Sequence, residues 1–189
     1  MPILDQLSTG IRSFNVGEYH RMGRAGIFAD NERTELIEGA VYSMPPAGPP
    51  HAAVVHFIFK YFLALLDAQV ADVRVEQPLS IDEYNEPLPD VMIVRPDWRG
   101  YFDAHPTPGD VFVIIEVADS SLDRDLRTKS KLYARAGIRE YWVVDVNERQ
   151  VHIFNRPSAE GYGEEQVLDD KGTMTLGSVS IEIARFFAP

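Results

Sequence analysis

The sequence predicts a single α/β domain built on a mixed β-sheet. The chain has 189 residues, of which 45% are hydrophobic, which is enough for one real core and too few for two comfortable ones. Strand and helix patterns interleave along it without the strict alternation of βαβ units, and this favours a mixed sheet flanked by helices. We expect residues 1–13 to form a flexible N-terminal segment and residues 14–189 to form the domain.

The N-terminal part is predicted to hold a short helix and a hairpin. Asn15 followed three residues later by Glu18 fits a capping box at the start of a helix. Beyond that helix, strand patterns at residues 34–37 and 40–44 flank the dipeptide Glu38-Gly39. A two-residue connection that contains glycine, between two strands, is typical of a tight β-hairpin.

A long helix is predicted after a proline-rich linker, with one face packed on the sheet. At 100° per residue, a set of apolar side chains and one histidine falls within about 120°. The set is His51, Val55, Ile58, Phe59, Phe62, Leu65 and Leu66. His51 lies in the first turn of this helix, where it could contact a phosphate or a metal, or serve as an ordinary helix-end or core residue.

The remainder of the chain is predicted to supply most of the sheet and one more helix. Runs of β-branched and aromatic residues indicate strands, and they lie around residues 74–76, 91–94, 111–117, 140–146, 150–155, 164–168 and 174–183. Helical periodicity appears among them at residues 123–136. Tyr141 and Trp142 are expected in the core rather than on a surface that stacks nucleobases.

Composition narrows the kinds of site that the chain can build. It has no cysteine, which excludes disulfides and thiolate metal sites, so any metal must be held by carboxylate, carbonyl or imidazole groups. Such ligands favour Mg²⁺ or Mn²⁺. No signal-peptide pattern opens the chain, and polar residues interrupt its longest helical apolar stretch, so we expect a cytoplasmic protein without a membrane span.

Charge is spread unevenly along the chain. The net charge of −11 argues against a general nucleic-acid coat protein, because affinity for polyphosphate rests on cationic side chains. Residues 95–139 hold eight Lys or Arg and seven Asp or Glu, whereas the rest of the chain holds ten and twenty-two. A bound polyanion would be met by this nearly neutral middle segment; the alternative is that surface charge simply varies along the chain.

An isolated carboxylate stands in the most apolar run of the chain. Glu116 is the sixth residue of the run 111–117, whose other members are all apolar. Burying an unpaired anion in a strand costs several kcal/mol or forces it to stay protonated. The run therefore indicates a cation nearby.

The neighbouring strand supplies a second carboxylate. If residues 91–94 and 111–117 pair antiparallel, with Arg95 near Val111, the numbers of facing residues sum to about 206 and Asp90 faces Glu116. Opposed like charges are destabilising unless a cation lies between them, which favours a metal clamp. Asp97, just after its strand, is interpreted instead as a turn residue.

Helical phase selects a lysine from the helix that follows. Lys129 falls on the same face as Leu132 and Tyr133, whereas Lys131 lies on another. A lysine on a packing face is uncommon unless it reaches a partner, and Glu116 on the adjacent sheet is one candidate. The alternative is a local pair with Asp125, worth only a few tenths of a kcal/mol.

Together these residues resemble the Uma-two (Uma2) family of restriction endonucleases, within the PD-(D/E)XK nuclease superfamily. The resemblance spans roughly residues 14 to 156 and is most specific between Glu116 and Asp145. It rests on Glu38 in a Leu-Ile-Glu-Gly turn, His51, Pro89-Asp90, Ile115-Glu116-Val117, Asp125, Lys129, Tyr133, Gly137 and the run Glu140-Tyr141-Trp142-Val143-Val144-Asp145. The chain departs from the superfamily pattern at Ala118, where a lysine is expected; in this family Lys129 stands in for it.

The resemblance implies a restriction-endonuclease-like fold and a metal-dependent nuclease. Asp90, Glu116 and Lys129 would be catalytic, with Asp90, Glu116 and Glu38 holding Mg²⁺ or Mn²⁺. His51 and Asp125 are secondary candidates. The implied substrate is nucleic acid, DNA before RNA, and double-strand cleavage with one site per chain would require a symmetric homodimer or sequential nicking.

Two other classes of function stay open at the level of sequence. One is a degenerate nuclease fold that acts as a binding or interaction module, which the acidic composition and Ala118 favour. The other is a metal-dependent hydrolase of a small phosphorylated substrate, which a narrow closed pocket would indicate. Convergence of Glu38, Asp90, Glu116 and Lys129 in space would favour the nuclease.

Overall fold

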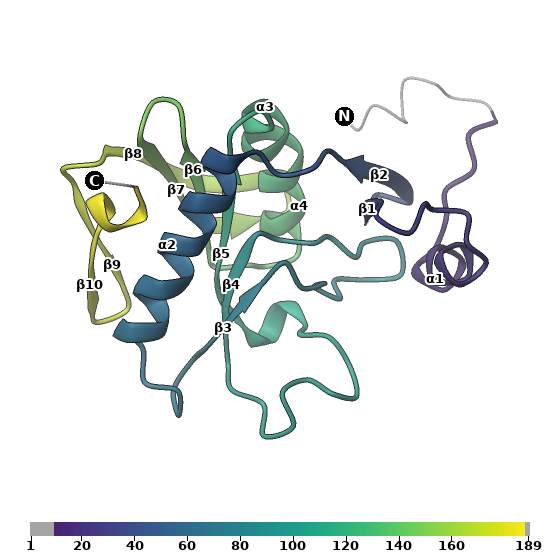
Figure 1. Ribbon diagram of the computed structural model, residues 1–189, viewed down its shortest axis with the longest axis horizontal. Helices are drawn as coiled ribbons and strands as arrows, with labels where there is room; N and C mark the ends of the chain where they lie inside the picture. The colour runs from purple at the N-terminus through teal and green to yellow at the C-terminus, as the bar shows by residue number, and fades with distance from the viewer. Residues whose placement is uncertain (1–9, 188–189) are drawn as a thin grey trace.

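A computed structural model describes residues 10–187 and has a six-stranded mixed sheet at its centre (Figure 1). The β5–β6 pair is parallel and the other neighbours in this sheet are antiparallel. The predicted fold class is therefore confirmed. In spatial order the strands are β3 (Asp72–Val75), β4 (Val91–Val94), β5 (Val111–Ala118), β6 (Glu140–Asp145), β7 (Gln150–Ser158) and β8 (Gly161–Asp169).

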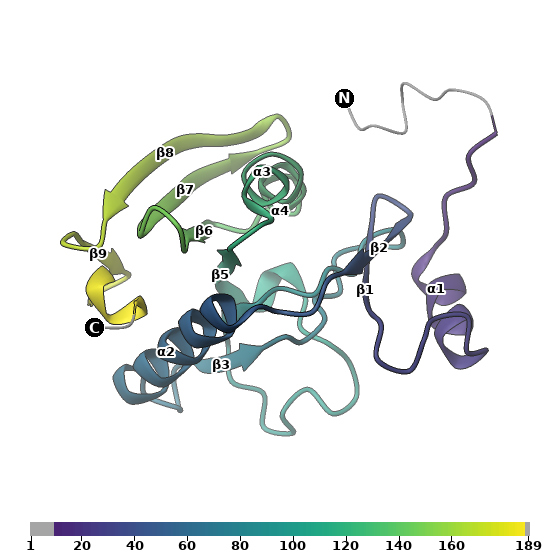
Figure 2. The ribbon, with the colours of Figure 1, turned by 45° about the horizontal axis from the view of Figure 1, so that its top comes forward.

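Helices cover both faces of the sheet, so its central strands are buried on both sides (Figure 2). The long helix α2 (Pro49–Leu65) packs on one face. The other face is covered by a helix in three parts: α3 (Leu122–Arg124), a π-helical turn (Asp125–Lys129) and α4 (Ser130–Arg135). Each face has its own apolar cluster, one beneath α2 and one beneath α4.

The predicted N-terminal elements are confirmed. Helix α1 (Val16–Arg24) begins with the capping box of Asn15 and Glu18. The hairpin of β1 (Arg33–Ile37) and β2 (Ala40–Met44) forms a separate two-stranded sheet that joins the body through the Leu36–Glu86 backbone pair (Figure 2).

The segment expected to be flexible, residues 1–13, lies mostly outside the described residues. Its last residue, Ser13, lies beside the hairpin turn at Gly39, and the next residue, Phe14, donates from its N to Gly39 O at 2.8 Å. Gly39 has a φ of +74°, and a Cβ there would lie 2.5 Å from the Cβ of Ser13, so both backbone conformation and space require glycine.

Two details differ from the sequence predictions. The last strand region is not one strand: it is a hairpin of β9 (Thr173–Leu176) and β10 (Val179–Glu182), since Gly177 adopts a φ of +59° and turns the chain. Leu65, assigned to the packing face of α2, is 37% exposed because it belongs to the helix's last turn.

No helix within residues 10–187 is long and apolar enough to cross a membrane.

The register predicted for the β4–β5 hairpin is confirmed. Val91 faces Ile115 and Ile93 faces Val113, which continues to Asp90 opposite Glu116. The register shifts between Ile93 and Val94, at the end of the hairpin remote from these carboxylates. The hairpin thus places both acidic residues at one edge of the sheet.

Candidate functional site

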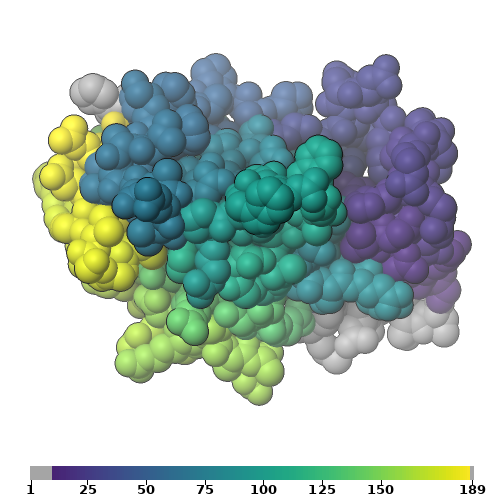
Figure 3. All heavy atoms as spheres, turned by 90° about the horizontal axis from the view of Figure 1, so that it is seen from below, coloured from purple at the N-terminus to yellow at the C-terminus, as the bar shows by residue number. Residues whose placement is uncertain are grey.

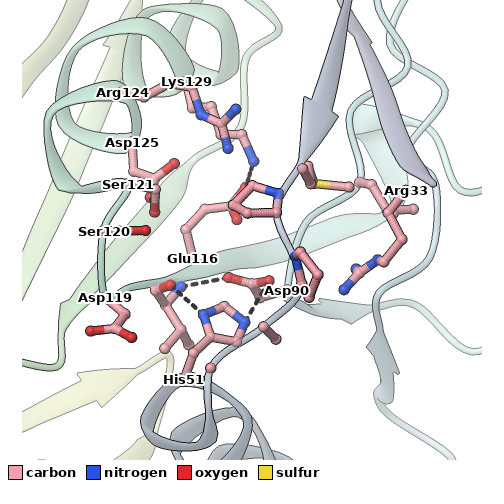
Figure 4. A pocket seen from close by; sticks show the side chains of 17 residues that line it. Arg33, His51, Asp90, Glu116, Asp119, Ser120, Ser121, Arg124, Asp125 and Lys129 are labelled. Atoms are coloured by element: carbon pink, nitrogen blue, oxygen red, sulfur yellow. Dashed lines mark hydrogen bonds and ion pairs between the residues drawn. The ribbon is translucent and has the colours of Figure 1, made fainter. Parts of the chain in front are cut away.

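A pocket lies at the sheet edge where Asp90 and Glu116 are found (Figure 4). Its walls come from β1, the linker before α2, the first turn of α2, the ends of β4 and β5, and the helix that follows. Most of its polar lining is charged: Arg33, His51, Asp90, Glu116, Asp119, Arg124, Asp125 and Lys129. Segments that are distant in sequence therefore converge on one polar site.

Lys129 is buried between two glutamates. Its Nζ lies 2.9 Å from Oε1 of Glu116 and 3.2 Å from Oε2 of Glu35, and its side chain is only 2% exposed. Tyr133 OH donates to the same Oε1 of Glu116 at 2.8 Å. Both donors therefore contact Oε1, on one side of the carboxylate. Lys129 thus pairs with β5 and β1 rather than along its own helix with Asp125, and Lys131 is exposed.

This lysine is the last residue of a π-helical turn, Asp125–Lys129. Ser130 N donates to Asp125 O, five residues back, which widens one turn of the helix. Both ends of the turn, Asp125 and Lys129, are buried. Asp125 lines the pocket and accepts a hydrogen bond from Ser121 Oγ. The secondary candidate Asp125 is therefore near Glu116 and Lys129, at the wall that carries the lysine.

The carboxylates around Lys129 outnumber its single positive charge. Burial raises the pKa of Glu116 to about 8; Lys129 opposes the rise, and the carboxylate of Asp90 adds to it. Burial alone would lower the pKa of Lys129, but the carboxylates of Glu116, Glu35 and others raise it above its ordinary value. The lysine stays charged, whereas Glu116 needs a further cation to be ionised at neutral pH.

Asp90 is held by the backbone of β5 and faces a histidine. Its Oδ2 accepts from Val117 N at 2.7 Å, and its Oδ1 lies 3.3 Å from Nε2 of His51. His51 Nδ1 is 2.9 Å from Val117 O, and because a carbonyl can only accept, Nδ1 carries the proton of that bond. Nε2 therefore directs its lone pair at a carboxylate unless a proton or a metal ion lies between them.

The hydrogen bond with Asp90 is the main cause that raises the pKa of His51. Burial alone would raise the pKa of Asp90, but the bond and charge of His51, with the charge of Lys129, lower it. Asp90 is thus a carboxylate at neutral pH, with a hydrogen-bond donor or cation required at Oδ1.

A third group completes this cluster. Glu76 follows β3, and its backbone N donates to Asp90 O at 3.0 Å. One ligand atom from each of His51, Glu76 and Asp90 lies within 4.8 Å of the other two. Glu76 has a φ of +51° and also pairs with Arg33 at 2.8 Å. Non-glycine residues with positive φ often mark functional constraints.

Glu76 and Glu35 were not predicted as site residues, although the sequence holds a signal for each. The register count that joins Asp90 to Glu116 also applies to β3: Val75 faces Val91, which continues to Glu76 opposite Asp90. Glu35 stands two residues before the buried Ile37 in a strand, so the two share a face.

Glu38 is the predicted site residue that the structure does not bring to the others. It occupies the β1–β2 turn with a φ of +52° and forms an ion pair with Arg135. It does not line the pocket. The structure therefore does not bring Glu38 into the pocket with Asp90, and Glu35 of the same hairpin reaches Lys129 instead.

Comparisons with known proteins identify a family and a similar fold. The model of a family described as "Uma2: Putative restriction endonuclease" matches residues 16–184. A crystal structure described as a "putative nuclease belonging to DUF820", from Anabaena variabilis ATCC 29413, resembles the fold with a TM-score of 0.71 and 15% sequence identity. The likeness covers 92% of this chain and 97% of that one. No curated protein sequence matches the chain.

Proposed function

Since the chain belongs to the Uma2 family of restriction-endonuclease-like proteins, we propose that it is a metal-dependent endonuclease that hydrolyses phosphodiester bonds of DNA. The observation that carries the proposal is that His51 and Asp90, two members of the metal-ligand cluster, line one pocket together with a buried lysine. Burying charge costs more than burying apolar residues. A degenerate binding module therefore has no physical reason to keep a charged lysine together with the carboxylates of Glu35, Asp90, Glu116 and Asp125.

The donor set fits a divalent cation. His51, Glu76 and Asp90 offer one imidazole nitrogen and two carboxylate oxygens within 4.8 Å of one another. Val117 O accepts from the other ring nitrogen of His51, as backbone carbonyls do for metal-binding histidines. Oxygen ligands suit Mg²⁺ and Mn²⁺, and the imidazole favours Mn²⁺ of the two. When bound, the cation would polarise the scissile phosphate and lower the pKa of a bound water.

Glu116 and Lys129 act beside that cluster. Glu116 holds the ammonium of Lys129 at 2.9 Å, and Lys129 stabilises the negative charge that develops on the phosphate during attack by water. The side chains of Arg33 and Arg124 also line the pocket, where guanidinium groups bind phosphate oxygens. Asp90 connects the metal-ligand cluster to the pair of Glu116 and Lys129, since it contacts His51 and lies opposite Glu116.

The proposal predicts metal-dependent nicking by the purified chain. Supercoiled plasmid and single-stranded DNA are incubated with Mg²⁺, Mn²⁺ or a chelator, using the wild type, Asp90→Ala and Lys129→Ala. We expect cleavage only with metal, and a loss of at least about 100-fold in both variants. Glu38→Ala is the matched control, because its carboxylate lies outside the pocket, and it should cleave like the wild type.

Other outcomes would identify a different function. Equal residual cleavage in all variants means a contaminating nuclease. Absence of both cleavage and Mn²⁺ uptake in a folded wild type means a binding module. Hydrolysis of small phosphate esters without cleavage of DNA means a small-substrate hydrolase. Because Lys129→Ala removes one partner of a buried pair, Glu116→Gln and circular dichroism separate a catalytic defect from misfolding.

A further inference from the structure

The loop between β4 and β5 exposes two aromatic rings around one arginine. Trp98 is 91% exposed and Phe102 is 79% exposed. The guanidinium carbon of Arg99 lies 5.6 Å from the centroid of the Trp98 ring and 5.0 Å from that of Phe102. The loop projects at the lower edge of Figure 1, and Figure 3 looks onto the face from which it projects. We call residues 97–103 the aromatic loop.

The aromatic loop is held in a defined conformation. Asp97 Oδ1 accepts from the backbone N of Arg99 and of Tyr101, each at 2.9 Å, which confirms the turn role predicted for Asp97. Tyr101 OH donates to Arg95 O at 2.8 Å. Gly100 and Tyr101 both have positive φ, a conformation that costs free energy at tyrosine and persists only where the surroundings impose it. The exposed rings are therefore presented by an ordered turn.

The surroundings of the aromatic loop are rich in guanidinium groups. Arg74 stacks over Tyr101 at 5.0 Å and Arg95 stacks over Phe112 at 5.3 Å. The acidic residues of the segment are engaged locally: Asp97 caps the turn, Asp103 pairs with Arg99, and Asp110 accepts from Thr107. In a chain of net charge −11, this is a place where a polyanion meets cations and π-faces together.

We propose that the aromatic loop is a nucleobase-stacking site for single-stranded nucleic acid, separate from the pocket of Asp90 and Glu116. Exposed aromatic rings beside arginines bind unpaired bases by stacking while the cations contact the phosphates. The inference rests on the proposed nuclease function and deepens it, since it names a substrate with unpaired bases. The loop lies at the opposite end of β4 and β5 from Asp90 and Glu116, so it binds a part of the strand remote from the bond that is cut.

A second copy of the chain fits this surface less well than a nucleic-acid strand. Two aromatic side chains offer roughly 300–500 Å², whereas a stable protein interface buries about 800 Å² on each partner. Arg99 lies over both rings, and Arg74 and Arg95 stack on the neighbouring Tyr101 and Phe112, so two copies would bring arginines together. A nucleic-acid strand supplies the opposite charge.

Intrinsic fluorescence tests the proposal directly, because the chain has two tryptophans with opposite exposure. Trp98 is exposed and Trp142 is fully buried, so a change of emission on binding reports on the loop. The full chain, in a chelator that prevents cleavage, is titrated with a 16-nucleotide oligothymidylate and with a duplex of the same length. We expect saturable quenching by the single strand that weakens with salt, and much less quenching by the duplex, whose bases are already stacked.

Variants assign the signal to the two rings. Affinity for a fluorescently labelled oligothymidylate, measured by anisotropy, should fall roughly 5- to 100-fold in Trp98→Ala and in Phe102→Ala, and Trp98→Phe should retain most of it. Val70→Ala is the matched control, because Val70 is also exposed but lies outside the loop, and it should bind like the wild type. Unchanged affinity in both alanine variants, or equal quenching by the duplex, overturns the proposal.

Self-association is the remaining outcome to separate. If Trp98 emission changes with protein concentration alone, and sedimentation shows a dimer that Trp98→Ala dissociates, the loop binds a second copy and the proposal is wrong. The chelated titration is independent of catalysis. If the oligothymidylate quenches Trp98 but the chain cleaves no DNA, the proposed nuclease function is wrong and the stacking site stands. If the loop variants cleave DNA and bind with wild-type affinity, the stacking site is wrong and the nuclease function stands.

Discussion

The two faces of β5 are built from the same strand and carry different tasks. Val113, Ile115 and Val117 face α2 within an entirely apolar cluster. On the other face, Glu116 stands between Ile114 and Ala118 and meets Lys129 and Tyr133. One face therefore contributes apolar burial alone, whereas the other combines an apolar cluster with buried charge, which serves chemistry at a cost in stability.

Removing Lys129 should have the largest effect on the charged face of β5. In Lys129→Met the glutamates Glu35 and Glu116 lose their shared cation while staying buried. We expect a loss of about 3–5 kcal/mol in the free energy of unfolding, measured by urea denaturation, and loss of nuclease activity. A variant within about 1 kcal/mol of the wild type would show that the charged face is not costly to disturb.

Truncation on the apolar face should affect stability without affecting chemistry. Ile115 is fully buried beneath α2, so Ile115→Ala should cost about 2–5 kcal/mol through lost burial and a cavity. Activity per folded molecule should stay within a few-fold of the wild type. A specific activity that falls as far as in Lys129→Met would mean that the two faces are not separable.

The two glutamates of the β1–β2 hairpin provide a matched pair for the third test. Glu35 is buried against Lys129, whereas Glu38 pairs with Arg135 at the partly exposed turn. Glu35→Gln should cost about 1–3 kcal/mol and lower activity by misplacing the lysine. Glu38→Gln should change stability by less than about 1 kcal/mol and leave activity unchanged. Equal effects of the two changes would argue against Glu35 as a positioning residue.

The smallest expected effect is a pH dependence of stability at the pocket. The pKa of His51 is raised above its ordinary value of 6.5 by its bond with Asp90, so the folded state binds that proton more tightly than the unfolded state. The stabilisation is fully present below pH 6.5, as long as Asp90 is ionised, and is lost as pH rises through the raised pKa.

Thermal unfolding in chelator, followed against pH, measures this effect. His51→Gln should remove the dependence, so that its melting curve differs from the wild type most on the acidic side and converges with it at higher pH. A constant difference across pH would indicate a packing role for His51 rather than a titrating pair.

Much of the fold and part of the site follow from local rules. Asp90 meets Glu116 because antiparallel register is a count along two strands, and Lys129 faces the sheet because helical phase is also a count. The same register count on β3 and β4 leads to Glu76, whereas Glu35 depends on how a separate hairpin docks on the sheet, which no count along one element gives. Glu38 was assigned by resemblance to a motif, and its side chain pairs with Arg135 and does not line the pocket.

The exposure of the rings in the aromatic loop also depends on more than local sequence rules. Trp98 and Phe102 read in sequence as ordinary apolar residues, and their exposure depends on a turn in which two residues adopt left-handed backbone conformations. Trp142 and Tyr141, by contrast, lie in a central strand and are buried as predicted.

The π-helical turn at Asp125–Lys129 also bears on how this site is inherited. Its Ser130-to-Asp125 bond encloses one residue more than an α-helical turn, so it is equivalent to a single-residue insertion. A relative without that insertion would keep its lysine at the same place in space only by carrying it one position earlier or later in sequence. Comparison column by column would then score the lysine as lost, and a functional enzyme would be counted among the inactive members.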